Sequence, residues 1–255
     1  MTAIRIIFVS LMLLTALPFV CQAANPVPDQ SELNREALGA ARSGNAISFK
    51  NTILQGASPD TRNRLGDSLL MSAIKNGQMD IMQLLLERGA NYNQANVAKV
   101  TPLMAAAFFG RTEMARLLIA KQADIHATDQ LHKTALVYAA GTDRSEIVGM
   151  LLGTGIDVNA AYENGLTALM WAGAYGHLAT VEMLLARGAD PLLQDNRGKT
   201  VAQMADENGH LAVVKFLQAR VAPAMLLPAK LSSTTSVRAP SVHAKLLPAT
   251  PIASE

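Results

Sequence analysis

The sequence predicts an all-α solenoid of about six helix–turn–helix units joined by short β-turn or hairpin connections. The main observation is a 33-residue period, at which serine or threonine recurs five times: Ser68, Thr101, Thr134, Thr167 and Thr200. A second phase of the period holds alanine six times: Ala40, Ala73, Ala106, Ala139, Ala172 and Ala205. Aromatic residues make up only 4% of the chain, which suits closely packed helices better than strands. Because one such unit is too small to bury its own apolar face, neighbouring units must stack into a continuous core.

Each unit is expected to contain two short helices. The first begins at the repeated serine or threonine, whose hydroxyl caps the free amides of the first turn, and Pro102 follows where its missing N–H does no harm. It ends at a glycine such as Gly77 or Gly110, because glycine adopts the left-handed conformation easily. In the second helix, as in residues 178–185, apolar residues recur at helical spacing, and a glycine such as Gly188 closes the unit.

Residues 1–24 have the pattern of a signal peptide. Arg5 precedes an apolar stretch of about 15 residues, which is shorter than the roughly 20 that a membrane-spanning helix needs. Small residues follow, so cleavage is expected after Ala23 or Ala24, with retention as an anchor as the alternative. Cleavage would also remove Cys21, the single cysteine. We therefore expect a periplasmic protein, or alternatively a secreted one, without stable membrane insertion after cleavage.

The rest of the chain divides into three parts. Residues 25–32 are expected to form a linker, and residues 33–220 the array of about six 33-residue repeats. Residues 221–255 hold five prolines among Ala, Ser, Thr and basic residues, which predicts a disordered Pro/Ala/Ser-rich tail. The tail contains Leu-Leu-Pro-Ala twice, at residues 226–229 and 246–249, and this element is either a docking motif or part of an inert tail.

The repeated motif resembles that of the ankyrin repeat family, whose units open with Thr-Pro-Leu-His, continue with Ala-Ala-x-x-Gly and end with Leu-Leu-x-x-Gly-Ala-Asp. Residues 101–103 and 106–110 match the first two parts, and residues 184–190 match the third. The resemblance covers about residues 33–220. It implies a stack of helix pairs that binds other proteins through a concave face.

Two departures from the family pattern bear on the structure. The family's histidine after Thr-Pro-Leu is replaced in five units: Met71, Met104, Val137, Met170 and Gln203. We therefore expect the hydrogen bonds between units at this position to be missing. Gln122 and Asp143 stand where the pattern has glycine, which predicts an irregular junction between the third and fourth units. The first and last units are expected to cap the array.

The composition and motifs favour neither catalysis nor a cofactor or metal site. With 22 Lys and Arg against 20 Asp and Glu, the formal charge of +2 gives no broad attraction to nucleic acid. His177 and His210 share one repeat phase and are expected to be structural, whereas His126 and His132 lie in a connecting turn. The recurring methionines are expected to fill gaps in the core; the alternative is an oxidation sink or a set of copper ligands.

With catalysis, cofactor binding and nucleic-acid binding disfavoured, the sequence favours recognition of another protein. In a solenoid the turn tips and the exposed ends of the first helices project from the same edge of every unit, and aromatic anchors within a polar rim supply affinity at protein interfaces. The residues expected to bind a partner on the concave face are Phe108, Phe109, Tyr175, Leu131, Lys133, Val100, Leu166 and Arg197. Tyr138 and Trp171 share a phase nearer the helix stack and are expected in the core.

The sequence thus predicts a non-catalytic, exported scaffold that binds a partner protein through its concave face. It is similar to the periplasmic ankyrin proteins of bacteria, which implies a role in oxidative-stress defence beside catalases or in immunity to secreted toxins. Two alternatives stay open at this point. One is an enzyme or metal-handling protein that uses surface Met and His, and the other is an effector delivered to a host cell.

Overall fold

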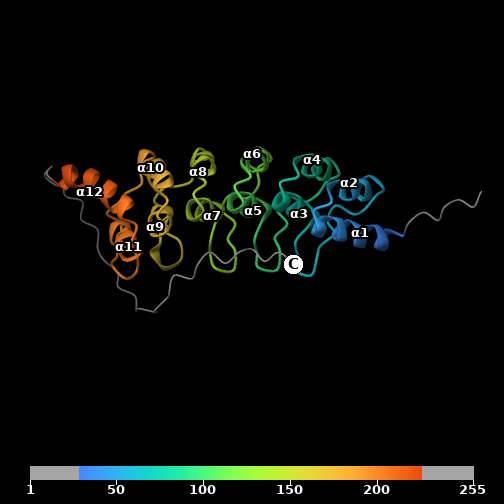
Figure 1. The fold of residues 1–255 in the computed structure, drawn as a ribbon, viewed down its shortest axis with the longest axis horizontal. Coiled ribbons are helices and arrows are strands. Elements are labelled where there is room, and N and C mark those ends of the chain that lie inside the picture. Colours follow the sequence, from blue (N-terminus) through green and yellow to red (C-terminus); the bar gives the residue numbers. More distant parts are fainter. Residues whose placement is uncertain (1–28, 226–255) are drawn as a thin grey trace, which may run out of the picture.

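The protein is an elongated stack of helix pairs (Figure 1). The structure is a computed structural model that describes residues 29–225, with side chains described as far as Arg220. The first helices of successive units form one row, the second helices form a second row, and the connecting loops extend from the first row (Figure 1). The helices of the described part are α1 (Gln30–Ser43), α2 (Ala46–Leu54), α3 (Leu69–Asn76), α4 (Met79–Glu87), α5 (Pro102–Phe108), α6 (Thr112–Ala120), α7 (Ala135–Gly141), α8 (Ser145–Leu152), α9 (Ala168–Ala174), α10 (Leu178–Ala186), α11 (Val201–Glu207) and α12 (Leu211–Met225). The predicted all-α solenoid of about six units is confirmed.

The repeated serine and threonine residues begin the first helices, as the sequence predicts. Ser68 Oγ accepts a hydrogen bond from the Met71 amide at 3.2 Å, and the threonines of the next four units bond the equivalent amides. Each such cap stabilises its helix by about 1 kcal/mol. In α5 and α9 the methionine that replaces the family's histidine also accepts a bond through sulfur from the backbone N–H of the capping threonine. At this position the methionine thus contributes a weak acceptor to the cap of its own helix.

Between the two rows lies a continuous apolar core. The alanines of the 33-residue phase from α3 to α11 are buried completely, which lets neighbouring first helices approach closely. Methionine residues of the first helices, including Met71, Met104 and Met170, are 0–1% exposed and fill this core. These sulfur atoms lie inside the stack, where a dissolved metal ion does not reach them.

The two positions that lack the family's glycine keep the geometry of the repeat. Gln122 and Asp143 adopt φ angles of 62° and 59°, the left-handed region that glycine occupies in the other units. A side chain in this conformation costs roughly 1–2 kcal/mol. The helix pairs of the third and fourth units therefore do not show the predicted irregularity. The two substitutions instead leave local backbone strain at Gln122 and Asp143.

The tips of the connecting loops differ at one junction. The amides of Val97, Gln130 and Asn196 each donate to a carbonyl of the preceding tip, at distances of 2.9–3.1 Å. Glu163 occupies the same repeat position, yet within the described residues its amide makes no such bond to the tip at residues 130–132. The loop tip of the fifth unit is a 3₁₀ turn, Glu163–Gly165, in which Asn164 and Gly165 both have positive φ angles. The irregular junction thus lies between the fourth and fifth units.

Polar side chains join successive units at the ends of the first helices. The Arg111 guanidinium donates to the Lys75 carbonyl at 2.8 Å, and His177 Nε2 donates to the Gly141 carbonyl at 3.0 Å. These carbonyls belong to the last turn of the preceding first helix and have no partner within that helix. The predicted structural role of His177 is confirmed by this contact.

The ends of the array extend slightly beyond the predicted repeat boundaries. Helix α1 begins at Gln30, inside the segment expected to be a linker, and α12 continues to Met225, past Arg220. The expected signal peptide (residues 1–24) and the tail from residue 226 onward lie outside the described residues. None of the helices between Gln30 and Met225 is both long and apolar enough to cross a membrane.

Candidate protein-binding surface

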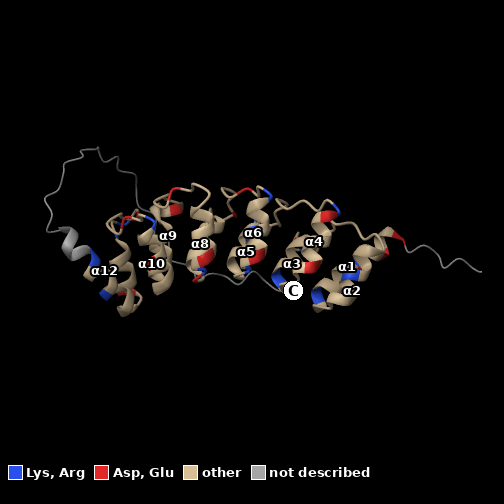
Figure 2. Cartoon of the chain, turned by 90° about the horizontal axis from the view of Figure 1, so that it is seen from above, with Lys and Arg blue, Asp and Glu red and all other residues tan. Residues whose placement is uncertain are grey.

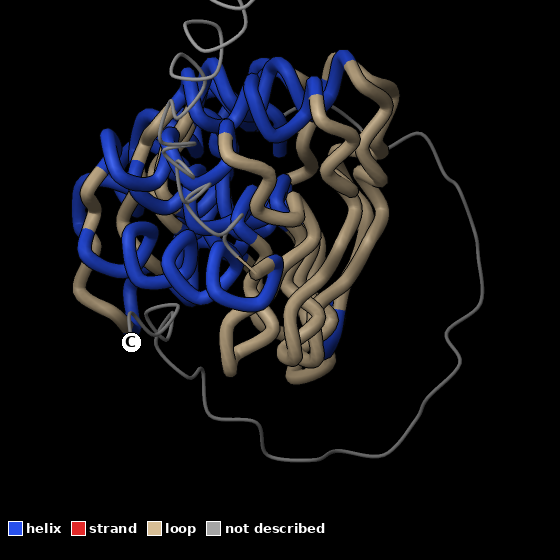
Figure 3. Tube along the Cα trace, turned by 90° about the vertical axis from the view of Figure 1, so that its right-hand side faces the viewer, coloured by secondary structure: helices blue, strands red, loops and turns tan. Residues whose placement is uncertain are grey.

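The inner face is the surface formed by the first helices and the loops that precede them. Seen along the array, the helices lie to one side and the loops of successive units overlay one another on the other (Figure 3). At each end of this face, a loop residue pairs with a residue eight positions later on the first helix. These terminal ion pairs are Asp67–Lys75 in the second unit, at 2.6 Å, and Lys199–Glu207 in the sixth unit, at 2.5 Å.

The same two positions hold no ion pair in the three central units. The combinations there are Val100 with Phe108, Lys133 with Gly141, and Leu166 with Ala174. Side chains that pair with one another near the ends are thus replaced in the middle by apolar or small residues, apart from Lys133, which faces Gly141 in this pattern. The centre of the inner face is consequently free of internal charge pairing within the described part of the chain.

Aromatic side chains occupy this centre. We call them the aromatic strip, and its members are Phe108, Phe109, Tyr138, Trp171 and Tyr175, all half-buried on or next to α5, α7 and α9. Phe108 packs edge-on against Phe109 and Tyr138, with ring centroids 5.1 and 5.9 Å apart. Trp171 and Tyr175 are stacked at 5.9 Å. The strip therefore presents rigid ring surfaces from three consecutive units.

A shallow hollow lies within the strip, between α7 and α9. It is lined by Lys133, Val137, Tyr138, Gly141, Thr142, Trp171 and Tyr175. Its volume of about 10 Å³ is too small for a small-molecule ligand, since ligand sites usually enclose hundreds of Å³. Gly141 places no side chain against these rings; a Cβ at that position would contact ring atoms of Tyr175 and Trp171 at 3.8–3.9 Å. The arrangement suits contact with the surface of another protein.

Lys133 is the charged residue of the hollow. Its ammonium lies 5.0 Å from the centre of the Trp171 ring and 5.9 Å from that of Tyr138, which is cation–π geometry. Partial burial lowers the pKa of Lys133, and the nearby carboxylates of Asp129 and Glu163 oppose this shift. No carboxylate in the described residues forms an ion pair with it.

Asp129 and Tyr138 fix the loop beside the hollow. Asp129 is buried; its Oδ1 accepts bonds from the amides of Leu131 and Lys133, and its Oδ2 accepts the Tyr138 hydroxyl at 2.7 Å. Burial and the bond to Asp129 raise the pKa of Tyr138 far above its usual value. Asp129 is thus engaged by the loop and the tyrosine and leaves Lys133 without a direct partner.

The structure separates the predicted binding residues into three groups. Phe108, Phe109, Tyr175 and Lys133 lie together around the strip, and Leu131 is 44% exposed at the neighbouring loop tip. Val100 and Leu166 are 4% and 7% exposed, so they pack beneath the surface. Arg197 lies at the tip of the sixth unit, where its guanidinium pairs with Asp195 at 2.7 Å.

Sequence reasoning missed two members of the strip. Tyr138 and Trp171, expected in the core, are half-buried and line the hollow. The available signal was the small residue Gly141 one turn after Tyr138, since a ring next to a small residue is left uncovered on its helix face. Both rings therefore pack against the core and also line the hollow.

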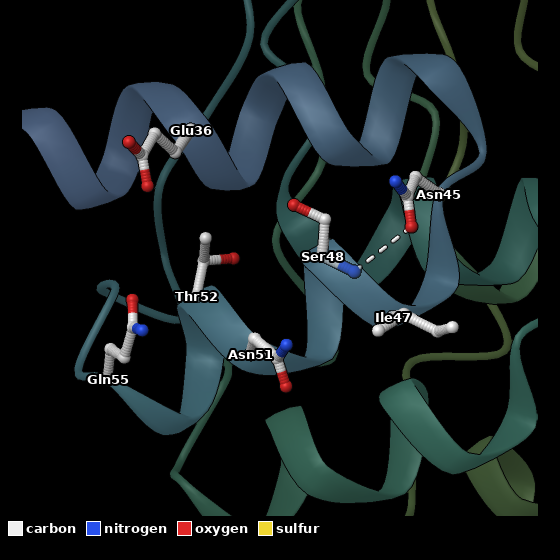
Figure 4. Close-up of a pocket in the computed structure, with 7 residues that line it drawn as sticks. All are labelled: Glu36, Asn45, Ile47, Ser48, Asn51, Thr52 and Gln55. Atoms are coloured by element: carbon white, nitrogen blue, oxygen red, sulfur yellow. Dashed lines mark hydrogen bonds between the residues drawn. The ribbon is translucent and has the colours of Figure 1, made fainter.

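A larger hollow, of about 420 Å³, lies in the first unit between α1 and α2 (Figure 4). It is lined by Glu36, Asn45, Ile47, Ser48, Asn51, Thr52 and Gln55. The Asn45 side chain caps α2 by accepting from the Ser48 amide, and Glu36 is the only ionisable residue of the lining. The lining contains no histidine, cysteine, lysine or second carboxylate beside Glu36. The hollow is the polar outer surface of the first unit.

Charges elsewhere are scattered. Lysine, arginine, aspartate and glutamate alternate along the array seen from above, without a field of one sign (Figure 2). Among the described residues, no three His, Cys, Asp or Glu side chains are grouped so as to hold a metal ion. The feature that distinguishes one face from another is the aromatic strip.

These features define a helical repeat protein whose central units present an aromatic surface with one lysine, Lys133, among the rings. The family pattern for ankyrin repeats in three copies matches residues 38–129, 122–195 and 161–224. The chain therefore belongs to the ankyrin repeat family. Members of this family are typically non-catalytic scaffolds that bind other proteins. A search of curated proteins finds no match to the chain.

Proposed function

We propose that this protein is a non-catalytic scaffold that binds a partner protein through the centre of its concave inner face. The observation that carries the proposal is the aromatic strip, which spans three units and is bounded by the terminal ion pairs. Clustered aromatic anchors within a polar rim supply most of the affinity at protein interfaces. The shallow form of the hollow favours a macromolecular ligand over a small molecule.

The test is affinity capture with purified wild-type protein and two variants, Phe108→Ala/Phe109→Ala and Trp171→Ala. Both variants should lose the captured partner, because removal of a central aromatic anchor costs 2 kcal/mol or more, roughly thirtyfold in affinity. The matched control is Leu54→Ala, which removes an exposed apolar side chain from α2, outside the inner face. Recovery of the same partners by all four proteins would exclude the strip as the binding surface.

We also propose that the protein is exported to the bacterial periplasm. The support is the sequence pattern of residues 1–24, with one basic residue, a short apolar stretch and small residues before the expected cleavage site. Cell fractionation and N-terminal sequencing of the purified chain test this. A mature N-terminus at Ala24 or Asn25 in the periplasmic fraction is expected, and an intact Met1 in the cytoplasm or in a host cell would contradict export.

Two biological settings are consistent with this proposal, oxidative-stress defence and immunity to a secreted toxin. The captured partner distinguishes them, since the first requires a protein of peroxide metabolism and the second a toxin. Unchanged capture after treatment with a chelator would exclude the alternative in which surface Met and His residues handle a metal.

A further inference from the structure

The central units of the inner face contain a lysine, Lys133, that forms no ion pair within the described residues. In the sixth unit, the Lys199 ammonium binds both carboxylate oxygens of Glu207, at 2.5 and 2.6 Å. Lys133 occupies the position of Lys199 in the fourth unit, and Gly141 occupies the position of Glu207. The carboxylate that completes the pair in one unit is therefore absent from the other.

A side chain at position 141 fits without overlap. A Cβ added to Gly141 would contact ring atoms of Tyr175 and Trp171 at 3.8–3.9 Å, which are ordinary van der Waals distances. The Lys133 ammonium is held near it by the Trp171 and Tyr138 rings. Asp129 is engaged by other donors, and Glu163 lies beyond ion-pair distance from the ammonium. A half-buried cation without a direct partner is a strong site for an incoming anion.

We propose that Lys133 binds a carboxylate side chain of an extended segment of the partner, in the place that Glu207 takes in the sixth unit. The proposal rests on the proposed function and specifies the chemistry of its ligand. Apolar residues on either side of the acidic residue contact the aromatic strip, whose rings flank the ammonium in the fourth and fifth units. The partner segment thus carries an Asp or Glu between apolar or aromatic residues.

The chain's own tail does not fit this description. Residues 226–255 contain Lys230, Arg238 and Lys245 against the single acidic residue Glu255, so the tail is basic. Its two Leu-Leu-Pro-Ala elements are apolar, but each has a lysine next to it in the sequence, Lys230 and Lys245. Like charges at close range oppose such docking. The observations therefore favour an acidic partner over the tail.

The first experiment selects ligands without assuming a partner. A displayed library of random 12-residue peptides is panned against full-length wild-type protein, Lys133→Met and Trp171→Ala. Wild type should enrich peptides with an acidic residue flanked by apolar residues, and Lys133→Met should lose the acidic preference while it keeps the apolar one. Selection of the same peptides by Trp171→Ala would exclude the proposed binding surface. Peptides that depend on Trp171 but show no acidic preference would overturn only the role of Lys133.

The second experiment measures the pairing directly. Trp171 is the single tryptophan of the chain, so its fluorescence reports occupancy of the hollow. A selected Glu-containing peptide should bind wild type about tenfold or more tightly than the same peptide with Gln. Lys133→Met should bind both peptides equally weakly, and Lys133→Arg should keep a preference for Glu. Equal discrimination by Lys133→Met and wild type, with both proteins folded by circular dichroism, would overturn the proposal.

Two further variants of the full chain complete the design. Gly141→Glu places a carboxylate where the sixth unit has one, and it should abolish the preference for Glu-containing peptides. Leu246→Ser/Leu247→Ser changes the second Leu-Leu-Pro-Ala element. A shift in Trp171 fluorescence caused by this tail variant, in the absence of peptide, would show that the tail occupies the hollow and would overturn the proposal.

Discussion

Near the ends of the inner face, a loop residue and a helix residue pair their charges, whereas the same positions in the three central units hold no ion pair and lie beside half-buried aromatic rings and one lysine. The helices, caps and core alanines are alike in both regions. The difference therefore lies in a few surface positions, and it shows how a repeat protein builds a site: the end units satisfy their own polar groups and the central units leave theirs to a partner. Four predictions test this comparison, from the largest expected effect to the smallest.

The two terminal ion pairs should differ in strength. Lys75→Met leaves the Asp67 carboxylate, which is 3% exposed, with only the side-chain amides of Asn63 and Asn96 as donors. This change should lower the free energy of unfolding by about 2–4 kcal/mol. Lys199→Met affects a pair whose side chains are 32% and 52% exposed, and the loss should be below about 1 kcal/mol. Urea denaturation measures both. Equal losses would show that burial does not distinguish the two ends.

Contact between first helices should be tighter toward the end of the array than at its centre. A Cβ at Gly173, on α9, would overlap Cγ2 of Val201 on α11, so Gly173→Ala should cost about 1–3 kcal/mol. Gly141→Ala, on the α7 side of the hollow, meets rings at 3.8–3.9 Å and should change stability by less than about 1 kcal/mol. Thermal unfolding compares them, and similar melting temperatures would contradict the difference in packing.

The loop beside the hollow should be sensitive to alkali through Tyr138. The bond to Asp129 should contribute about 1 kcal/mol at neutral pH, which Tyr138→Phe would remove. Because the pKa of Tyr138 is raised in the folded state, the unfolded chain releases its proton first above about pH 10, and stability falls as the pH increases further. Urea unfolding at a series of pH values should show a smaller alkaline loss for Tyr138→Phe than for wild type. Identical slopes would exclude this bond as the cause.

The smallest effect concerns the turn that closes the third unit. Gln122 is exposed and has φ of 62°, where the equivalent residues of other units are glycines with open space around them. Gln122→Gly should therefore raise the free energy of unfolding by about 0.5–1 kcal/mol, since the relief of strain exceeds the added chain entropy. Calorimetry or urea denaturation measures the gain. A loss of stability would mean that the Gln122 side chain contributes contacts of its own.

The fold could be predicted because its determinants are local and repeat every 33 residues. Caps such as Thr101 and turn glycines such as Gly77 act within their own unit, and the buried alanines need only one neighbour. The surface was predicted less completely. Exposure of Tyr138 and Trp171 depends on what the next unit places beside them, and Val100 and Leu166 are buried in the folded stack although their loop position predicts exposure. The pairing of positions eight residues apart likewise becomes visible only once loop and helix are folded together.

The absence of a tip-to-tip bond from the Glu163 amide has a consequence for the motion of the array. At the other tip junctions a main-chain bond restrains neighbouring loops, so the fourth and fifth units are joined more loosely along this edge than their neighbours. Hydrogen–deuterium exchange should accordingly be faster at Glu163 than at Val97, Gln130 or Asn196. Bending at this junction would tilt two blocks of repeats against each other and change the distance between the rings of the fourth and fifth units. The binding surface would then fit ligands of different thickness.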